Sequence, residues 1–132
     1  MTSGIILSKG NGFGDPCQWS LGWPAQDGGI ALRIENNFFG TGFGSAPIGR
    51  WGHIALVKRG ASCQAYANGK PSGEPHDLSK LGPFVNDRPL RIGRREHEPN
   101  PAFFNGKLSR IVLLNCALDP DQIQAHAQGK AD

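Results

Sequence analysis

The chain has 132 residues, of which 19 are glycine and 10 are proline, and its formal net charge at pH 7 is +3. This length predicts a single domain over residues 1–132, and glycines and prolines scattered between short apolar runs are typical of strands joined by tight turns. The small charge argues against a nucleic-acid binder, and no apolar run approaches the roughly 18 residues of a membrane helix.

The first third of the chain predicts strands that each bury one face. A short apolar run, Ile5–Lys9, ends at a glycine-rich turn. Apolar and polar residues alternate on both sides of Asp27-Gly28-Gly29, so residues 18–36 predict a hairpin. A looser, glycine-rich stretch follows up to Arg50.

The middle of the chain predicts a second hairpin. Residues 54–57 form a β-branched and apolar run, and Cys63–Ala67 is expected to pair back on it through a turn at residues 59–62. Asn68-Gly69 marks another tight turn, because both residues tolerate the positive φ of a type I′ turn. The stretch that follows is expected to be a long connection, since it is interrupted by Pro71, Pro75, Pro83 and Pro89.

Two further strands are expected before the end of the chain. In the short run Leu90–Gly93, Arg91 alternates with apolar neighbours, so we expect Arg91 on the solvent-exposed face of a strand. This interpretation is simpler than a basic stripe formed by Arg88, Arg91, Arg94 and Arg95. Residues 107–114 form a near-continuous apolar run, which is typical of a strand covered on both faces.

The last predicted element is a short helix. Asp119 is its expected N-cap, Pro120 takes the first helical position, and Gln122 completes a capping box. Ile123 and Ala127 share one face of this helix, and Gly129 is a natural stop.

The cysteines point to no special chemistry. Cys17, Cys63 and Cys116 are odd in number and form no Cys-x-x-Cys pair, so buried thiols are the simplest expectation. A nucleophilic pair of Cys63 with His53 lacks a visible third group to orient it, and we expect structural roles for both.

Four segments, met in this order, resemble the laminin-G-like jelly rolls of the concanavalin A-like lectin/glucanase superfamily. The strands before the central hairpin are similar at GIILSKGNG, WSLGW and GGIALRI. The hairpin carries the family's pattern at Trp51, His53, Ala55, Leu56, Tyr66, Asn68 and Gly69. The later segments match at Leu90, Ile92 and Gly93, and then at Phe104, Gly106, Leu108, Ile111, Leu118 and Ile123.

The resemblance implies an all-β fold, an antiparallel jelly-roll sandwich with one short C-terminal helix. The family normally has about two strands before the equivalent of Ile5, which this chain lacks, so an open sheet edge is expected. That edge predicts a homodimer, or a reduced sandwich in which another segment fills the gap. Relatives are usually extracellular, whereas this chain starts without a secretory signal.

The resemblance further implies a non-catalytic module that binds a glycan or a protein ligand. Glycosidases of this superfamily carry paired carboxylates in a Glu-x-Asp-x-Glu pattern, which this chain does not contain. The alternative is a structural or assembly domain that oligomerises through its open sheet edge.

Two sets of candidate site residues follow from these expectations. Exposed aromatic rings stack on sugars, and the candidates are Trp23, Phe38, Phe39 and Phe43. Trp19, Trp23 and Trp51 all alternate like strand residues, so at least two of them are expected in the core. Relatives often hold calcium through loop acids, and the candidates are Asp15, Asp27, Asp77 and Asp87. Core packing for the aromatics and solvated turns for the acids are the alternatives.

Overall fold

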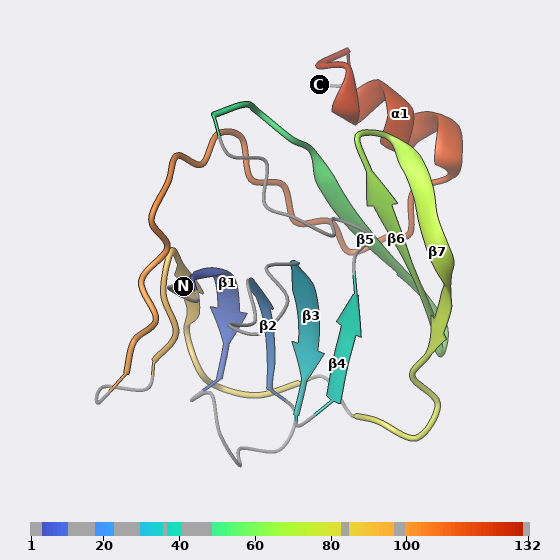
Figure 1. Ribbon diagram of the computed structural model, residues 1–132. Coiled ribbons are helices and arrows are strands. Elements are labelled where there is room, and N and C mark those ends of the chain that lie inside the picture. The colour runs from blue at the N-terminus through green and yellow to red at the C-terminus, as the bar shows by residue number, and fades with distance from the viewer. Residues whose placement is uncertain are drawn as a thin grey trace.

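Short strands joined by turns form two antiparallel sheets (Figure 1). The computed structural model describes residues 4–10, 18–22, 30–35, 37–40, 49–82, 85–96 and 100–130. The five-stranded sheet has the order β4-β3-β2-β1-β8 and the three-stranded sheet the order β5-β6-β7. The strands are β1 (Ile5–Lys9), β2 (Trp19–Gly22), β3 (Ala31–Ile34), β4 (Asn37–Gly40), β5 (Ile54–Arg59), β6 (Ser62–Ala67), β7 (Lys70–Asp77) and β8 (Leu90–Ile92). The predicted antiparallel sandwich is confirmed.

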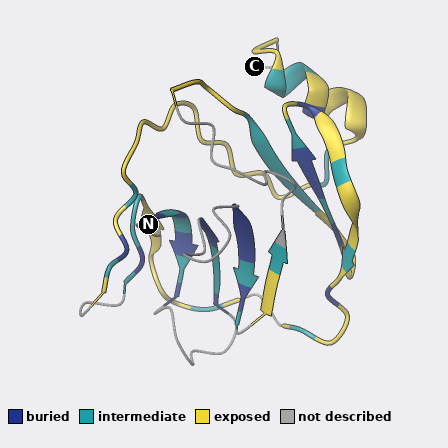
Figure 2. Ribbon diagram, in the orientation of Figure 1, coloured by how far each residue is buried: buried dark blue, intermediate teal, exposed yellow. Residues whose placement is uncertain are grey.

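The two sheets share an apolar core. Leu32 and Ile34 of β3 pack with Cys63 of β6 and with Leu78, which follows β7. A second cluster joins residues of three neighbouring segments, Ile6, Leu21 and Ile30. Leu56 of β5 packs against both clusters. Figure 2 shows the buried positions on β3 and β6, the strands that lie inside their sheets.

The predicted connection after Asn68-Gly69 is wrong, because β7 continues the hairpin as a full strand. It pairs with β6 from Ala67↔Lys70 to Ser62↔Asp77. Pro71 and Pro75 are tolerated because β7 is an edge strand, where a missing N–H costs no ladder bond on the open side. Gly73, with φ of +69°, lies where the register shifts, and its carbonyl accepts a bond of 3.2 Å from Gln64 Nε2.

The predicted two-sided strand over residues 107–114 is also wrong. The segment belongs to no strand, and its five large apolar side chains are 38–57% exposed. They are Leu108, Ile111, Val112, Leu113 and Leu114. A continuous apolar run fits a buried strand only when neighbouring strands are available on both sides. The exposed thiol of Cys116, just after this segment, likewise corrects the expectation of a buried one.

The helix α1 (Pro120–Ala127) begins and ends where the sequence predicts. Gln122 N donates to Asp119 Oδ1 over 2.8 Å, and Asp119 N donates to Gln122 Oε1 over 2.9 Å, which completes the capping box. Gly129, with φ of +70°, follows the last turn. Within the described residues, no helix is long and apolar enough to cross a membrane.

One edge of the five-stranded sheet is partly covered by the chain that follows β8. Ile5 N donates to Ala102 O over 2.9 Å, and Phe104 N donates to Gly93 O over the same distance. A parallel bridge joins Ile5 to Phe103. The strands β4, β5 and β7 remain at the edges of their sheets.

Candidate functional site

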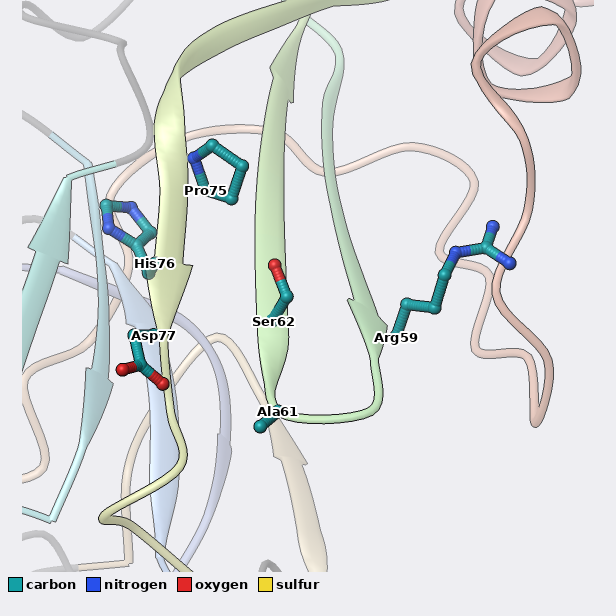
Figure 3. A pocket seen from close by; sticks show the side chains of 6 residues that line it. All are labelled: Arg59, Ala61, Ser62, Pro75, His76 and Asp77. Atoms are coloured by element: carbon teal, nitrogen blue, oxygen red, sulfur yellow. The ribbon is translucent and has the colours of Figure 1, made fainter.

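A shallow hollow of about 320 Å³ lies on the three-stranded sheet, at the end where β5 turns into β6 (Figure 3). The residues that line it are Arg59, Ala61, Ser62, Pro75, His76 and Asp77. Arg59 lies opposite Ser62 and Ser62 lies opposite Asp77, so the three form one row across all three strands. Residues directly opposite one another share a face of the sheet, and Figure 3 shows Ser62 between the two charged side chains.

The row combines a cation, a hydroxyl and an anion, all exposed to solvent. The Arg59 guanidinium makes no hydrogen bond or ion pair with any residue that the structure describes. Its five donors are therefore available to a ligand. Pro75, two residues from Asp77 along β7, adds an apolar ring to the same end of the sheet.

Local turns hold this row in place. The two-residue turn Gly60-Ala61 joins β5 to β6, with Gly60 at φ of +60°. Leu78 N donates to Ala61 O over 2.7 Å, which ties the end of β7 to that turn. The Asp77 carboxylate accepts from Ser79 N over 2.9 Å. Hydrogen bonds from the backbone and side chain of Ser79 lower the pKa of Asp77, so this group is a carboxylate at neutral pH.

His76 borders the hollow and also contacts one of the predicted aromatic residues. Its ring lies 5.0 Å from the ring of Phe39 in β4, with the ring planes tilted by 47°. Phe39 is half-buried and packs against the core cluster of Leu32 and Ile34. Phe38 is 59% exposed, and Arg33 lies 5.3 Å from the centre of its ring. The two adjacent phenylalanines thus point to opposite faces of the sheet and do not share a site.

The other candidates are distributed as follows. Trp23, Phe43, Asp15 and Asp27 lie outside the described residues. Asp77 belongs to the hollow, and Asp87 is exposed in the turn before β8. The structure does not show Asp77 and Asp87 in one group.

Trp51 is an exposed aromatic ring that the sequence pattern assigned to a strand. Its side chain is 66% exposed, whereas Trp19 packs against the core as expected. Trp51 precedes β5, and Arg59 ends it, eight residues further on. The strand β5 that separates them spans roughly 17 Å at about 3.3 Å per residue, so Trp51 is not part of the hollow.

Sequence reasoning missed Arg59, Ser62, Pro75 and His76. The sequence places Arg59 and Ser62 in a turn, and its prolines favour a connection over residues 70–77. The signal that could have found them is Asn68-Gly69 itself. A type I′ turn requires a partner strand on each side, so the residues after it had to pair with Cys63–Ala67 despite their prolines.

Calcium, which the fold family implies, does not fit the described residues. It requires six to eight oxygen ligands, several of them usually carboxylates. No three His, Cys, Asp or Glu side chains gather in the described part of the chain. Asp77 is bonded to Ser79, and the oxygens on either side of Asp87 accept hydrogen bonds from Lys9.

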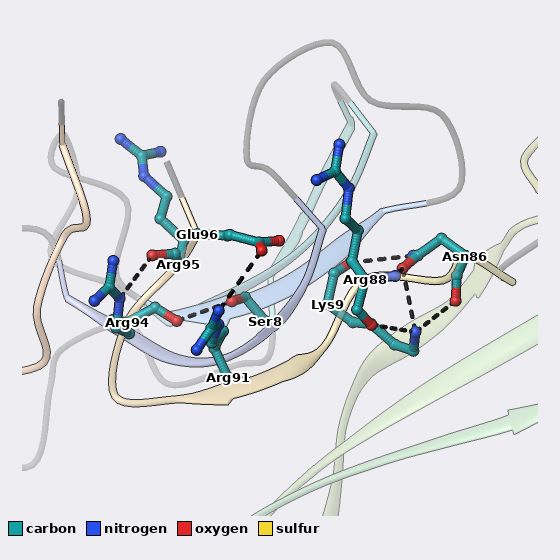
Figure 4. A network of polar contacts seen from close by, with 8 residues as sticks. All are labelled: Ser8, Lys9, Asn86, Arg88, Arg91, Arg94, Arg95 and Glu96. Carbon is teal, nitrogen blue, oxygen red and sulfur yellow. Dashed lines mark hydrogen bonds and ion pairs between the residues drawn. The ribbon is translucent and has the colours of Figure 1, made fainter. Parts of the chain in front are cut away.

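The arginines near β8 are engaged within the protein (Figure 4). Arg91 Nη2 lies 3.6 Å from Glu96 Oε1, and Arg95 Nε donates to Asn100 O over 2.7 Å. Arg94 Nε donates to Arg95 O over 3.1 Å, while Arg94 O accepts from Ser8 Oγ over 2.8 Å. These contacts fasten the loop after β8 to β1. They suit a structural role better than a row of phosphate contacts.

Cys63 and His53 do not form a reactive pair. Cys63 lies opposite Lys58, five residues after His53, so roughly 17 Å of strand separates them. Burial raises the pKa of the Cys63 thiol, which keeps it protonated and a poor nucleophile.

Comparison with known proteins agrees with this architecture. A laminin G family model, described as the concanavalin A-like lectin/glucanases superfamily, matches residues 1–124. The chain is similar to a crystal structure of an S-layer domain-containing protein from Clostridium thermocellum, with 19% identity and a TM-score of 0.51. That likeness concerns the fold alone and covers 94% of this chain but 62% of the solved one. No curated protein matches. These findings fit a binding or structural module.

Proposed function

Because the chain belongs to the concanavalin A-like lectin/glucanase superfamily, we propose that it is a non-catalytic module that binds carbohydrate at the hollow on its three-stranded sheet. The observation that carries the proposal is the row of Arg59, Ser62 and Asp77 across β5, β6 and β7.

The chemistry of this row matches that of a sugar. Neighbouring sugar hydroxyls both donate and accept hydrogen bonds, and a row that contains a carboxylate and a guanidinium offers the complementary acceptors and donors. Asp77 accepts and Arg59 donates, while the Ser62 hydroxyl does both. The Pro75 ring supplies an apolar surface for the C–H face of a pyranose.

The same row argues for binding without hydrolysis. A retaining glycosidase needs two carboxyl groups about 5 Å apart, and an inverting one needs them about 6.5–9.5 Å apart. Asp77 is the only carboxylate among the described residues that line the hollow. Among the described residues, this site therefore offers no second carboxylate for general acid or base catalysis.

The test is a glycan array probed with the purified domain, followed by titration of the best glycan. Asp77→Asn keeps the oxygen that accepts from Ser79 and removes the charge, so it should weaken binding at least about tenfold without unfolding the protein. Glu74→Gln is the matched control, because it removes an exposed carboxylate of the same strand outside the hollow. Equal affinities for the two variants would contradict the proposed site.

A second candidate function is assembly, and the exposed apolar segment at residues 108–114 favours it. Ile111 to Leu114 place four large apolar side chains in succession at the surface, each 38–57% exposed. Contiguous exposed apolar surface of this kind marks interaction sites. A second copy that pairs along this segment would form the homodimer expected for an open sandwich.

Measurement of the mass in solution tests this second function. A dimer should give twice the chain mass by light scattering, and Val112→Asp should reduce it to the monomer. Val85→Asp, which changes an exposed valine outside that segment (77% exposed), should leave the mass unchanged. A monomeric natural chain that binds a glycan would support the first function and contradict the second.

A further inference from the structure

The three-stranded sheet is too narrow to cover the whole core face of the five-stranded sheet. At about 4.8 Å per strand, three strands span roughly 14 Å and five span roughly 24 Å. On one side, His76 of β7 meets Phe39 of β4. On the other side, Leu56 of β5 packs against the cluster that contains Ile6 of β1 and Leu21 of β2. Because β8 follows β1 in the strand order, it lies beyond the part that β5 covers.

The core-facing side chains of β8 are exposed as a result. Ile92 lies opposite Leu7, which packs against the core cluster of Ile6 and Leu21. Residues directly opposite one another share a face of the sheet, and so do residues two apart along a strand, so Ile92 and Leu90 both stand on the core face. Yet Ile92 is 56% exposed and Leu90 is 38% exposed. In the described part of the chain, the core face at β8 therefore lacks a covering layer.

The free edge of β5 borders this uncovered surface. Among the described strands, β5 pairs with β6 alone, and its six residues, Ile54–Arg59, include neither proline nor glycine. The other two edges are better protected, because β7 carries two prolines and β4 is four residues long. A strand that added to the free edge of β5 would lie over the side chains of Leu90 and Ile92. We call this edge and these two side chains the β5–β8 corner.

The same chain carries a segment that suits this corner. Residues 108–114 belong to no strand, and their five large apolar side chains are 38–57% exposed (Figure 2). At about 3.3 Å per residue the segment can extend over roughly 23 Å, close to the roughly 20 Å of β5. Apolar residues in succession are typical of a strand that has neighbours and cover. The segment thus lacks a sheet, and the corner lacks a strand.

We propose that residues 108–114 of one copy of this chain add as a strand to the β5–β8 corner of a second copy, and that the exchange is reciprocal. The proposal rests on the assembly function proposed above and names the surface that receives the segment. Each copy brings five apolar side chains from the segment and two from β8, all 38–57% exposed. Two equal contacts of this kind bury apolar surface on the order of 1,000 Å², the size at which specific interfaces begin.

The first experiment changes the corner and leaves the segment intact. The natural chain should have twice the chain mass by light scattering, and Ile92→Asp should reduce it to the chain mass, because a charge would be buried without a partner. Phe38→Asp is the matched control. Phe38 is 59% exposed in the same sheet but lies opposite Arg33, on the face away from the core, so this variant should keep the doubled mass. If Ile92→Asp does not fold, Leu90→Asp changes the same corner and is measured in the same way.

The second experiment mixes two variants that are each expected to be monomeric. Val112→Asp damages the segment and keeps the corner, whereas Ile92→Asp damages the corner and keeps the segment. An equimolar mixture should form mixed dimers, because one of the two reciprocal contacts remains intact. Native mass spectrometry, with one variant labelled with ¹⁵N, distinguishes a mixed dimer from a dimer of either variant.

The outcomes separate this inference from the assembly function on which it rests. A natural chain that is monomeric at all concentrations would contradict both. A natural dimer that persists in Ile92→Asp and in Leu90→Asp would leave assembly standing and overturn the corner as its surface. A mixture of the two variants that stays monomeric would likewise overturn the reciprocal exchange, because segments that pair only with each other cannot complement a damaged corner.

Discussion

Single residues with unusual backbone angles determine where the strands of the candidate site end. Asn68 and Gly69 both adopt positive φ, +50° and +85°, and so form the type I′ turn between β6 and β7. Gly69 has a second reason to be glycine, because a Cβ there would lie 3.0 Å from Ala127 Cβ and 3.2 Å from Gln124 Cα of α1. One residue thus serves both the hairpin and its contact with the helix.

We expect Gly69→Ala to lower the free energy of unfolding by about 2–3 kcal/mol, because left-handed backbone strain adds to crowding against the helix. Gly60→Ala is the control, since Gly60 has φ of +60° but an added Cβ there would meet nothing within 4 Å. Gly60→Ala should lower the free energy of unfolding by about 1 kcal/mol. Urea unfolding measures both values, and equal losses would mean that the helix contact at Gly69 has no energetic weight.

Among the elements, the contact between α1 and the three-stranded sheet carries a titratable group. His53, just before β5, is half-buried, and its Nδ1 is buried without a hydrogen-bond partner in the described structure. Burial and the nearby charge of His126 in α1 both lower the pKa of His53. The neutral imidazole is therefore the form that fits the docked helix.

This pKa predicts how stability depends on pH. The unfolded chain binds a proton at His53 more readily than the folded chain, so the contribution of His53 is complete above the ordinary histidine pKa of about 6.5. It is lost as the pH falls below that value toward the folded pKa. His126→Gln removes the repulsion and should raise the pKa of His53 in an NMR titration. His76→Gln, on the face of β7 that meets Phe39, should leave it unchanged.

In the whole molecule, stability depends on side chains that join the two sheets. Leu56 packs against both apolar clusters, whereas Val57 beside it points to the opposite face of β5. The two clusters together contain buried residues from the first and second halves of the chain. The sandwich should therefore unfold as one cooperative unit.

We expect Leu56→Ala to lower the free energy of unfolding by about 2–4 kcal/mol, since it removes contacts with both clusters at once. Val57→Ala should cost about 1 kcal/mol or less. Chemical denaturation of both variants gives the values. A loss for Leu56→Ala as small as that for Val57→Ala would show that the clusters are held by other contacts.

Most of the elements could be predicted from local chemistry. The alternating run at 19–22 and 31–34, the Asn68-Gly69 turn and the capping box of Asp119 and Gln122 all lie where the sequence places them. Each of these elements depends on interactions between residues that are close in the sequence, so the local pattern of residue types is enough to predict it. The resemblance to laminin-G-like domains added the two-sheet arrangement to these local predictions.

The sequence by itself determined the strands, turns and helix caps, because their dihedral preferences and most of their signals are local. Only the tertiary structure decided that β7 accepts two prolines, since this depends on the place of β7 at a sheet edge. It likewise decided that residues 108–114 lie exposed, since this depends on whether neighbouring strands are available to cover them. It also decided the candidate site, because Arg59, Ser62 and Asp77 meet only through strand register, and it decided structural contacts such as that of Lys9 with Asn86 across 77 positions of the chain. Contacts between distant residues are set by packing, which no local pattern encodes.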